Sequence, residues 1–171
     1  PGCGVFIGSD GILGNVGKLI VDSIERIDRQ CFYEMMDVKS VCPRFQQLSA
    51  PQKSRFWVWV FASIAQVESS CRQRVEAQGI NGTADGLFQL EYSHALRRAA
   101  GRDPELCRTG GPADSTDVTF QVECAISIFR DHHCRGDQVR SLVFRGGYWQ
   151  KLNGPHRAIS RLVRQFPGCQ Q

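Results

Sequence analysis

The sequence predicts a mainly α-helical domain, and three observations support this fold class. Apolar residues recur at helical spacing in several segments, strand-like alternation is scarce, and no internal repeat or low-complexity tract occurs. The 171 residues, 42% of them hydrophobic and 22% charged, can bury a sizeable core and do not have the composition of a disordered chain. No stretch approaches the roughly 20 apolar residues that cross a bilayer, so we expect no membrane span.

The first half of the chain predicts an irregular lead-in and two helices. The lead-in, residues 1–18, is rich in glycine and shows little periodicity. Helical spacing of apolar residues then runs from Leu19 to Met36. A second helix is predicted to begin after Ser49, which suits an N-cap, and to end near Cys71. This helix is apolar over much of its surface, which is typical of a helix buried in the middle of a domain.

The second half predicts a loop followed by further helices. Residues 79–86 are rich in Gly, Asn, Thr and Asp, the composition of a loop. A short helix is predicted over 93–100 and a long amphipathic one over about 116–133. Two shorter helices, about 138–145 and 155–166, complete the predicted fold.

Eight cysteines are spread along the chain without any C-x-x-C pair, so the usual zinc and thioredoxin spacings are absent. An even, dispersed set of this kind predicts up to four disulfides and an oxidising compartment. The alternative is a cytosolic protein with eight reduced thiols. We expect an exported protein, periplasmic or extracellular; the sequence does not choose among the 105 possible pairings.

The charge is uneven along the chain. The formal net charge is +4; the segment from Arg130 onward has a balance of +6, and the residues before it sum to −2. The basic residues are interspersed with core-forming ones and no nucleic-acid motif accompanies them, so we expect no nucleic-acid partner. Two interpretations of the basic segment remain: a solvated basic face, or a surface that adheres to an anionic polymer.

Glu68 is the candidate catalytic residue on physical grounds. It terminates the very apolar second helix, so its carboxyl group would lie at the boundary between core and solvent. Burial of this kind raises a carboxyl pKa and keeps the group protonated near neutral pH, as a general acid must be. The alternative is a solvated residue that merely ends an amphipathic helix.

Two sequence blocks lie close together near the end of the second predicted helix. The first is Ile-Ala-Gln-Val-Glu-Ser-Ser-Cys over 64–71, and the second is Ala-Asp-Gly-Leu-Phe-Gln-Leu over 84–90. These blocks resemble the transglycosylase SLT family, which belongs with goose-type lysozymes in the lysozyme superfamily. Their order and separation match the family, with Phe88 in place of the usual Met. The convincing part of the resemblance covers about residues 61–90.

The resemblance implies a mainly α, lysozyme-like fold with a substrate cleft, stabilised here by disulfides. Glu68 matches the catalytic acid that protonates the glycosidic oxygen between N-acetylmuramic acid and N-acetylglucosamine. Ser69 matches the serine that positions the substrate or the acid, and Gln89 matches the glutamine that lines the sugar cleft. Residues 79–86 would form the wall beside the scissile bond.

The chain also departs from the family pattern. The late Ala-Tyr-Asn-Ala-Gly block is absent, and Tyr148 is the candidate to replace its tyrosine, the alternative being an ordinary packed aromatic. Glu91 and Tyr92 replace the usual Met-Pro. Glu91 stands where goose-type lysozymes carry an acidic residue, so it is assigned as a second catalytic carboxylate, or else as a loop ion-pair partner. Asp85 and Tyr92 complete the expected substrate-binding set.

The sequence therefore predicts one lysozyme-like catalytic domain over 1–171, with 1–48 as lead-in and N-terminal helix and 49–171 as the catalytic core. We expect a monomeric peptidoglycan-cleaving glycosidase, a muramidase, acting on glycan strands with no metal or organic cofactor. Asp85 and Glu91 would also favour de-N-acetylated glycan, whose ammonium groups they attract. The alternatives are a lytic transglycosylase that gives 1,6-anhydro products and a non-catalytic wall-binding module.

Overall fold

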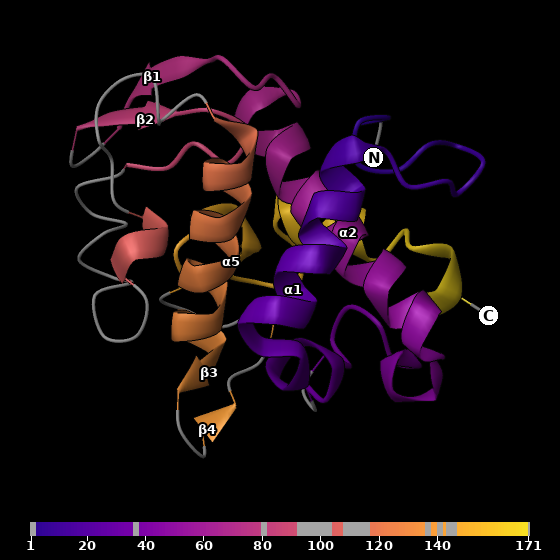
Figure 1. Ribbon diagram of the computed structural model, residues 1–171. Helices are drawn as coiled ribbons and strands as arrows, with labels where there is room; N and C mark the ends of the chain where they lie inside the picture. Colours follow the sequence, from indigo (N-terminus) through magenta and orange to yellow (C-terminus); the bar gives the residue numbers. More distant parts are fainter. Residues whose placement is uncertain are drawn as a thin grey trace.

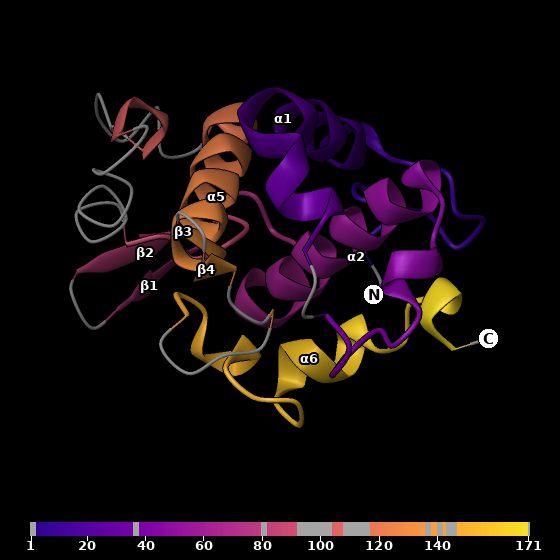
Figure 2. The same ribbon diagram turned by 90° about the horizontal axis from the view of Figure 1, so that it is seen from below.

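Helix α2 (Ala50–Ser69) lies at the centre of the molecule, between α1 (Asn15–Tyr33) and α6 (Ala158–Val163), and α5 (Val118–His133) packs along α1 (Figures 1 and 2). The computed structural model describes residues 3–35, 38–79, 82–91, 104–107, 117–135, 138–139, 142 and 147–170. The mainly helical fold class is confirmed. In the described part of the chain, no helix is both long and apolar enough to span a bilayer.

Two short hairpins and four 3-10 turns complete the described structure. In the first hairpin β1 (Glu76–Gln78) pairs antiparallel with β2 (Thr83–Asp85), and in the second β3 (Cys134–Arg135) pairs with β4 (Gln138–Val139). The first hairpin lies at the C-terminal end of α2 (Figure 1). The 3-10 turns are η1 (Phe45–Gln47), η2 (Pro104–Cys107), η3 (Gln150–Leu152) and η4 (Pro167–Cys169).

Several of the sequence predictions for local structure are wrong in part. Helix α1 begins at Asn15, so residues 15–18 do not belong to an irregular lead-in, and only Ala158–Val163 of the helix predicted over about 155–166 is α-helical. Residues 79–86 are not simply a loop, because 83–85 form a strand of the first hairpin. The strands are three residues long and mostly exposed, so they lack the apolar alternation that signals a strand. The helix predicted over 138–145 is also wrong at its start, where Gln138–Val139 form a strand. The helix predicted over 93–100 lies outside the described residues.

The predicted start of α2 is confirmed in detail. The Ser49 hydroxyl accepts a hydrogen bond from the backbone N–H of Gln52, and the Gln52 side chain accepts one from the Ser49 N–H. This capping box satisfies two backbone donors that a helix start leaves without partners. Pro51 occupies the first turn, where its missing N–H costs nothing.

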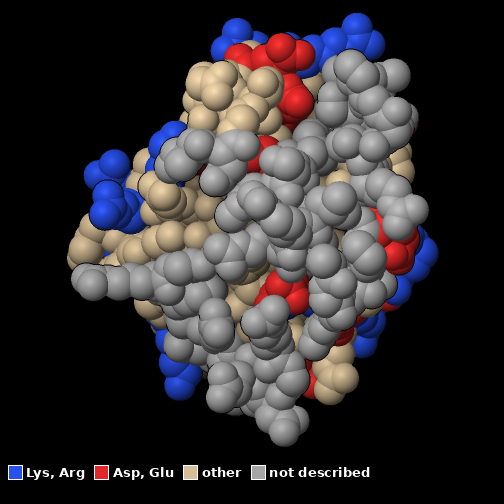
Figure 3. Space-filling model, turned by 90° about the vertical axis from the view of Figure 1, so that its left-hand side faces the viewer, with Lys and Arg blue, Asp and Glu red and all other residues tan. Residues whose placement is uncertain are grey.

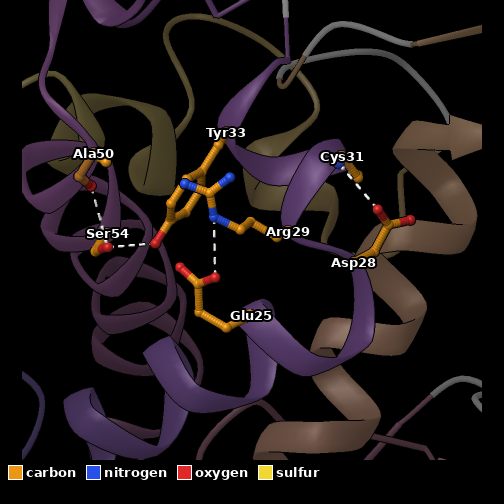
Figure 4. A network of polar contacts seen from close by, with 7 residues as sticks. All are labelled: Glu25, Asp28, Arg29, Cys31, Tyr33, Ala50 and Ser54. Carbon is orange, nitrogen blue, oxygen red and sulfur yellow. Dashed lines mark hydrogen bonds and ion pairs between the residues drawn. The ribbon is translucent and has the colours of Figure 1, made fainter.

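Helix α1 bends at Asp28, where the backbone leaves helical geometry (φ −167°, ψ 74°). The Asp28 carboxylate accepts from the N–H of Cys31 at 3.0 Å and so caps the last turn (Figure 4). Beyond the bend the Tyr33 hydroxyl bonds to Ser54 of α2, and the Arg29 guanidinium lies 4.8 Å from the centre of the Tyr33 ring. This network fixes the end of α1 against the first turns of α2.

The core is an aromatic cluster centred on Trp57 of α2. Its ring is fully buried and makes edge-on contacts with Phe32, Phe56 and Phe129 at centroid distances of 4.9–5.4 Å. The Trp57 indole N–H donates to the Phe32 carbonyl, which satisfies its one polar atom. α2 is thus held rigidly along most of its length, and its C-terminal end is presented from a fixed support.

All eight cysteines pair, so the predicted four disulfides are confirmed and their connectivity is now assigned. The pairs are Cys3–Cys71, Cys31–Cys134, Cys42–Cys169 and Cys107–Cys124. The first ties the lead-in to the turn directly after α2, and the third ties the C-terminus to the segment before α2. Disulfides of this number fit a protein of an oxidising compartment.

Candidate functional site

Glu68 lies in the last turn of α2, at the boundary between core and solvent that the sequence predicts. Only 18% of its side chain is exposed, and burial raises the pKa of its carboxyl group. The neighbouring ammonium of Lys151 opposes this rise in pKa. A mostly buried carboxyl with a raised pKa can hold a proton at a pH where ordinary glutamates have lost theirs.

The backbone around Glu68 adopts strained conformations. Among the described residues, three non-glycine residues have positive φ: Ser70 (54°), Cys71 (62°) and Gln89 (49°). Ser70 and Cys71 end α2, and Gln89 lies in the turn that faces this end. Left-handed geometry at such residues persists only where the surroundings enforce it, and it clusters at functional sites. The Cys3–Cys71 disulfide supplies one such constraint.

Ser69 is buried (3% exposed) and joins the helix end to the facing turn. Its hydroxyl oxygen lies 2.8 Å from the carbonyl oxygen of Leu87 and 2.9 Å from that of Ala65. The single hydroxyl proton can be donated to either carbonyl. Ser69 is thus an internal tie between the two sequence blocks, with its hydroxyl turned away from solvent. Its role in positioning the substrate or the acid stays a prediction.

Gly86 and Gln121 fix the same turn from the opposite side. The fully buried Gln121 side chain of α5 accepts from the N–H of Leu87 at 2.7 Å and donates to the carbonyl of Gln73 at 3.3 Å. Gly86 has φ +74°, and a Cβ there would lie 2.3 Å from the Gln121 Oε1. Glycine is thus required at 86 both for its conformation and for the close approach of Gln121.

Gln89 uses its side chain to close this turn. The Nε2 donates to the carbonyl oxygens of Val75 and Gly86, both at 3.0 Å. The side chain is half-buried, so one side of it stays accessible. The structure places Gln89 between the hairpin and the turn, where its amide links the two.

Tyr148 lies beside Glu91. The Tyr148 hydroxyl accepts from the Glu91 backbone N–H at 2.9 Å, and the adjacent Trp149 donates its indole N–H to the carbonyl of Phe88 at 3.0 Å. Burial above all, together with the charges of Glu91 and Glu68, raises the pKa of Tyr148 to about 12, although the bond from the Glu91 N–H opposes the rise. The hydroxyl is therefore within electrostatic reach of both carboxyl groups and stays protonated at neutral pH.

Acidic side chains gather at the β1–β2 hairpin. Asp85 stands directly opposite Glu76 in the strand register, and burial followed by the Glu76 charge raises the Asp85 pKa. The Glu91 carboxylate lies against Gly79, where a Cβ would come within 2.1 Å of its Oε1. Acidic and basic side chains meet at the top of Figure 3, at the level of the hairpin in Figure 1. Like charges placed opposite each other destabilise a hairpin, which points to a role other than stability.

Lys151 of η3 brings a cation to Glu68. Its Nζ lies 3.5 Å from the Glu68 Oε1, and half of the lysine side chain is exposed. An exposed ammonium can move away from Glu68 with little loss, since such ion pairs contribute little to stability. The contact lowers the Glu68 pKa in the free protein without neutralising the effect of burial.

Six of the seven predicted site residues fall in described segments, and the structure brings them to one region at the end of α2. They are Glu68, Ser69, Asp85, Gln89, Glu91 and Tyr148; Tyr92 lies outside the described residues. Sequence reasoning missed Glu76, Gln121 and Lys151. A hairpin prediction would have placed Glu76 opposite Asp85, but no sequence pattern links Gln121 or Lys151 to partners 34 and 83 residues away.

No protein-family model matches the chain, and no curated protein matches it. Solved structures, in contrast, match the chain. Bd0314 DslA, in its wild-type form 2, superposes with a TM-score of 0.68 at 16% identity, covering 95% of this chain and 93% of that chain. Two variants of the same protein, each with a glutamate replaced by glutamine, give TM-scores of 0.68 and 0.66 at 18% and 16% identity. At these identities the likeness shows a shared fold over nearly the whole chain.

Proposed function

We propose that the protein is a peptidoglycan-cleaving glycosidase, a muramidase, that cuts the β-1,4 bond between N-acetylmuramic acid and N-acetylglucosamine. The observation that carries the proposal is the environment of Glu68. Its carboxyl group is mostly buried, has a raised pKa, and ends a rigid helix beside a hairpin rich in carboxylates. The family resemblance of the blocks around Glu68 and Gln89 supplies the substrate class.

Glu68 acts as the general acid. Its proton passes to the glycosidic oxygen as the bond to the muramic acid C1 breaks, and positive charge develops on that sugar ring. The carboxyl becomes a carboxylate in this step, and the Lys151 ammonium 3.5 Å away stabilises the new charge. Tyr148, neutral because of its high pKa, offers a hydroxyl that interacts electrostatically with both Glu68 and Glu91 without adding charge.

The second carboxylate decides between hydrolysis and transglycosylation. An inverting hydrolase places a carboxylate about 6.5–9.5 Å from the acid to hold a water molecule. Glu91 is our candidate, because its backbone is fixed by Tyr148 and its carboxylate packs beside the hairpin. Without such a group the muramic acid 6-hydroxyl would attack instead, which makes a lytic transglycosylase the alternative reaction.

The released muropeptides test these alternatives directly. Purified walls digested with the protein and analysed by mass spectrometry should yield reducing sugars, because Glu91 supplies an activated water. Anhydro products, lighter by one water, would identify a lytic transglycosylase. Walls that are bound but not cut would identify a non-catalytic wall-binding module.

The same digestion tests the substrate form. The carboxylates of Asp85, Glu91 and Glu76 lie at one hairpin and would attract the ammonium groups of de-N-acetylated glycan. We expect faster release of muropeptides from deacetylated walls than from the same walls after chemical re-acetylation. Equal rates on both kinds of wall would refute the preference for de-N-acetylated glycan without affecting the proposed cleavage reaction.

Replacing Lys151 by methionine should shift the alkaline limb of the pH–activity profile to higher pH. Lys151 lowers the Glu68 pKa, so its removal lets burial raise the pKa further and keeps the acid protonated at higher pH. The profile of kcat/KM against pH reports the pKa of the free protein. Lys39→Met, at an exposed lysine outside the site, is the control. A limb that stays in place would mean that another group controls it.

A further inference from the structure

A groove of about 860 Å³ opens on the side of α2 away from the β1–β2 hairpin. Its walls come from the lead-in loop and from the C-terminal segment, which both views place on that side (Figures 1 and 2). The residues that carry the argument are Gln52, Arg55, Trp59, Gln66, Gln165 and Phe166. The volume is that of a small-molecule site. None of the residues assigned to the reaction lines this groove.

The floor of the groove is a stripe of polar and amphipathic side chains on a helix that is otherwise mostly buried. Gln52, Arg55, Trp59 and Gln66 follow one another at intervals of three, four and seven residues, so they share one face of α2. The other faces of the helix are packed into the core. This stripe gives the groove a polar floor with Arg55 as its charged group, while the Gln52 oxygen already accepts from the Ser49 N–H.

Trp59 forms a fixed aromatic surface in the groove. Its indole N–H donates to the carbonyl of Leu162 at 2.8 Å, and Phe166 meets its ring at a centroid distance of 5.8 Å and an angle of 69°. The indole is only partly buried. A ring held in one orientation binds a ligand without first losing conformational entropy.

Arg55 gives the groove a positive charge. Its side chain is exposed, and among the described residues it has no ion pair and no carboxylate lines the groove. Asp10, on the lead-in loop, is turned into its own loop, where it accepts from the N–H of Ile12 at 2.9 Å. An arginine fork next to glutamine amides suits a carboxylate attached to a peptide backbone.

Both walls of the groove are anchored by disulfides. Cys3–Cys71 holds the lead-in loop against the end of α2, and Cys42–Cys169 holds the C-terminal segment against the chain before α2. The groove is therefore present in the free protein and does not have to be assembled by its ligand, as befits a binding site built on rigid elements.

Resting on the proposed function, we propose that this groove binds the carboxylate-bearing peptides that peptidoglycan carries, with Arg55 pairing to the carboxylate and Trp59 packing against the peptide. The acetylated glycan backbone is neutral, whereas its peptides bear free carboxylates, so the positive groove favours the peptides. A second contact with the wall raises the local concentration of glycan strands for Glu68 on the other side of α2.

The test is the binding of muramoyl dipeptide, which carries a free carboxylate and no bond for Glu68 to cut. Titration followed by tryptophan fluorescence should show saturable binding to the wild-type protein. Arg55→Met should weaken it about tenfold or more, the scale of a charge-assisted hydrogen bond. Arg55→Lys should recover part of the loss, and Arg44→Met, at an exposed arginine outside the groove, should have no effect. The dipeptide amide should bind the wild type as weakly as the acid binds Arg55→Met.

Several outcomes would overturn the groove proposal: no binding of the dipeptide, equal binding by wild type and Arg55→Met, or an N-acetylglucosamine tetramer that needs Arg55 for its affinity. The last would make the occupant a glycan. Cleavage separates this proposal from the proposed function. If the protein cuts walls but its binding of the dipeptide does not depend on Arg55, only the groove proposal is refuted. If binding depends on Arg55 but the protein cuts no walls, only the glycosidase proposal is refuted.

Discussion

Glu68→Gln should reduce the rate of wall cleavage by about 10²–10⁴-fold, the usual contribution of a general acid. Glutamine keeps the shape of the side chain but cannot form the ion pair with Lys151, and it has no acidic proton to give to the glycosidic oxygen. The rate is measured as loss of turbidity of purified walls and as muropeptide release. Glu34→Gln, at an exposed glutamate at the end of α1, is the matched control and should keep full activity.

The same variant has a second readout in stability. Burial raises the Glu68 pKa in the folded state, so the folded protein binds this proton more tightly than the unfolded chain does. The stability contributed by the protonated form is present at low pH and is lost as the pH rises through the folded-state pKa. Glu68→Gln should therefore have the higher Tm at neutral pH and should match wild type in acid. Wall cleavage that survives the substitution would refute the assignment of the acid.

Gly86→Ala should destabilise the protein by about 2–5 kcal/mol, from a left-handed alanine and a broken buried hydrogen bond. Its methyl group would come within 2.3 Å of the Gln121 Oε1. Gln121 must then withdraw, which leaves the buried N–H of Leu87 without its acceptor. Urea unfolding measures the loss, and activity should fall too, because the turn also carries Gln89 and leads to Glu91.

Gly154→Ala is the control for Gly86→Ala. A Cβ at Gly154 would meet only the Arg157 side chain, at 3.5 Å, and the backbone there is not in the left-handed region. The control should unfold near the wild-type urea concentration. If Gly86→Ala unfolds there as well, the turn can shift without loss, and Gln121 is not the support that we assign to it.

The features that sequence reasoning predicted are those fixed by neighbouring residues. Ser49 and Gln52 lie three positions apart, so the capping box and the start of α2 can be read locally. The apolar length of α2 equally predicts that Glu68 stands at the edge of the core. α2 is twenty residues long and apolar over much of its surface, which is typical of a helix buried in the middle of a domain.

The features that it did not predict either leave no clear pattern in the local sequence or depend on residues far apart in the chain. The bend of α1 depends on the Asp28 backbone, and the first hairpin is too short and exposed to show alternation. Lys151 reaches Glu68 only after η3 has been placed beside the end of α2. The disulfide pairing could not be predicted for the same reason, because no local spacing pattern among the eight cysteines selects which of them pair.

The Cys42–Cys169 disulfide closes a ring of chain with a sequence separation of 127 residues, and the whole of α2, the hairpin and α5 lie within it. A protease that cuts one peptide bond inside this ring cannot release a fragment, since both pieces stay joined through sulfur. The packed core can then hold the severed ends near their original positions. Outside a cell, where proteases are abundant and replacement is slow, such a molecule survives a single nick as one covalent body.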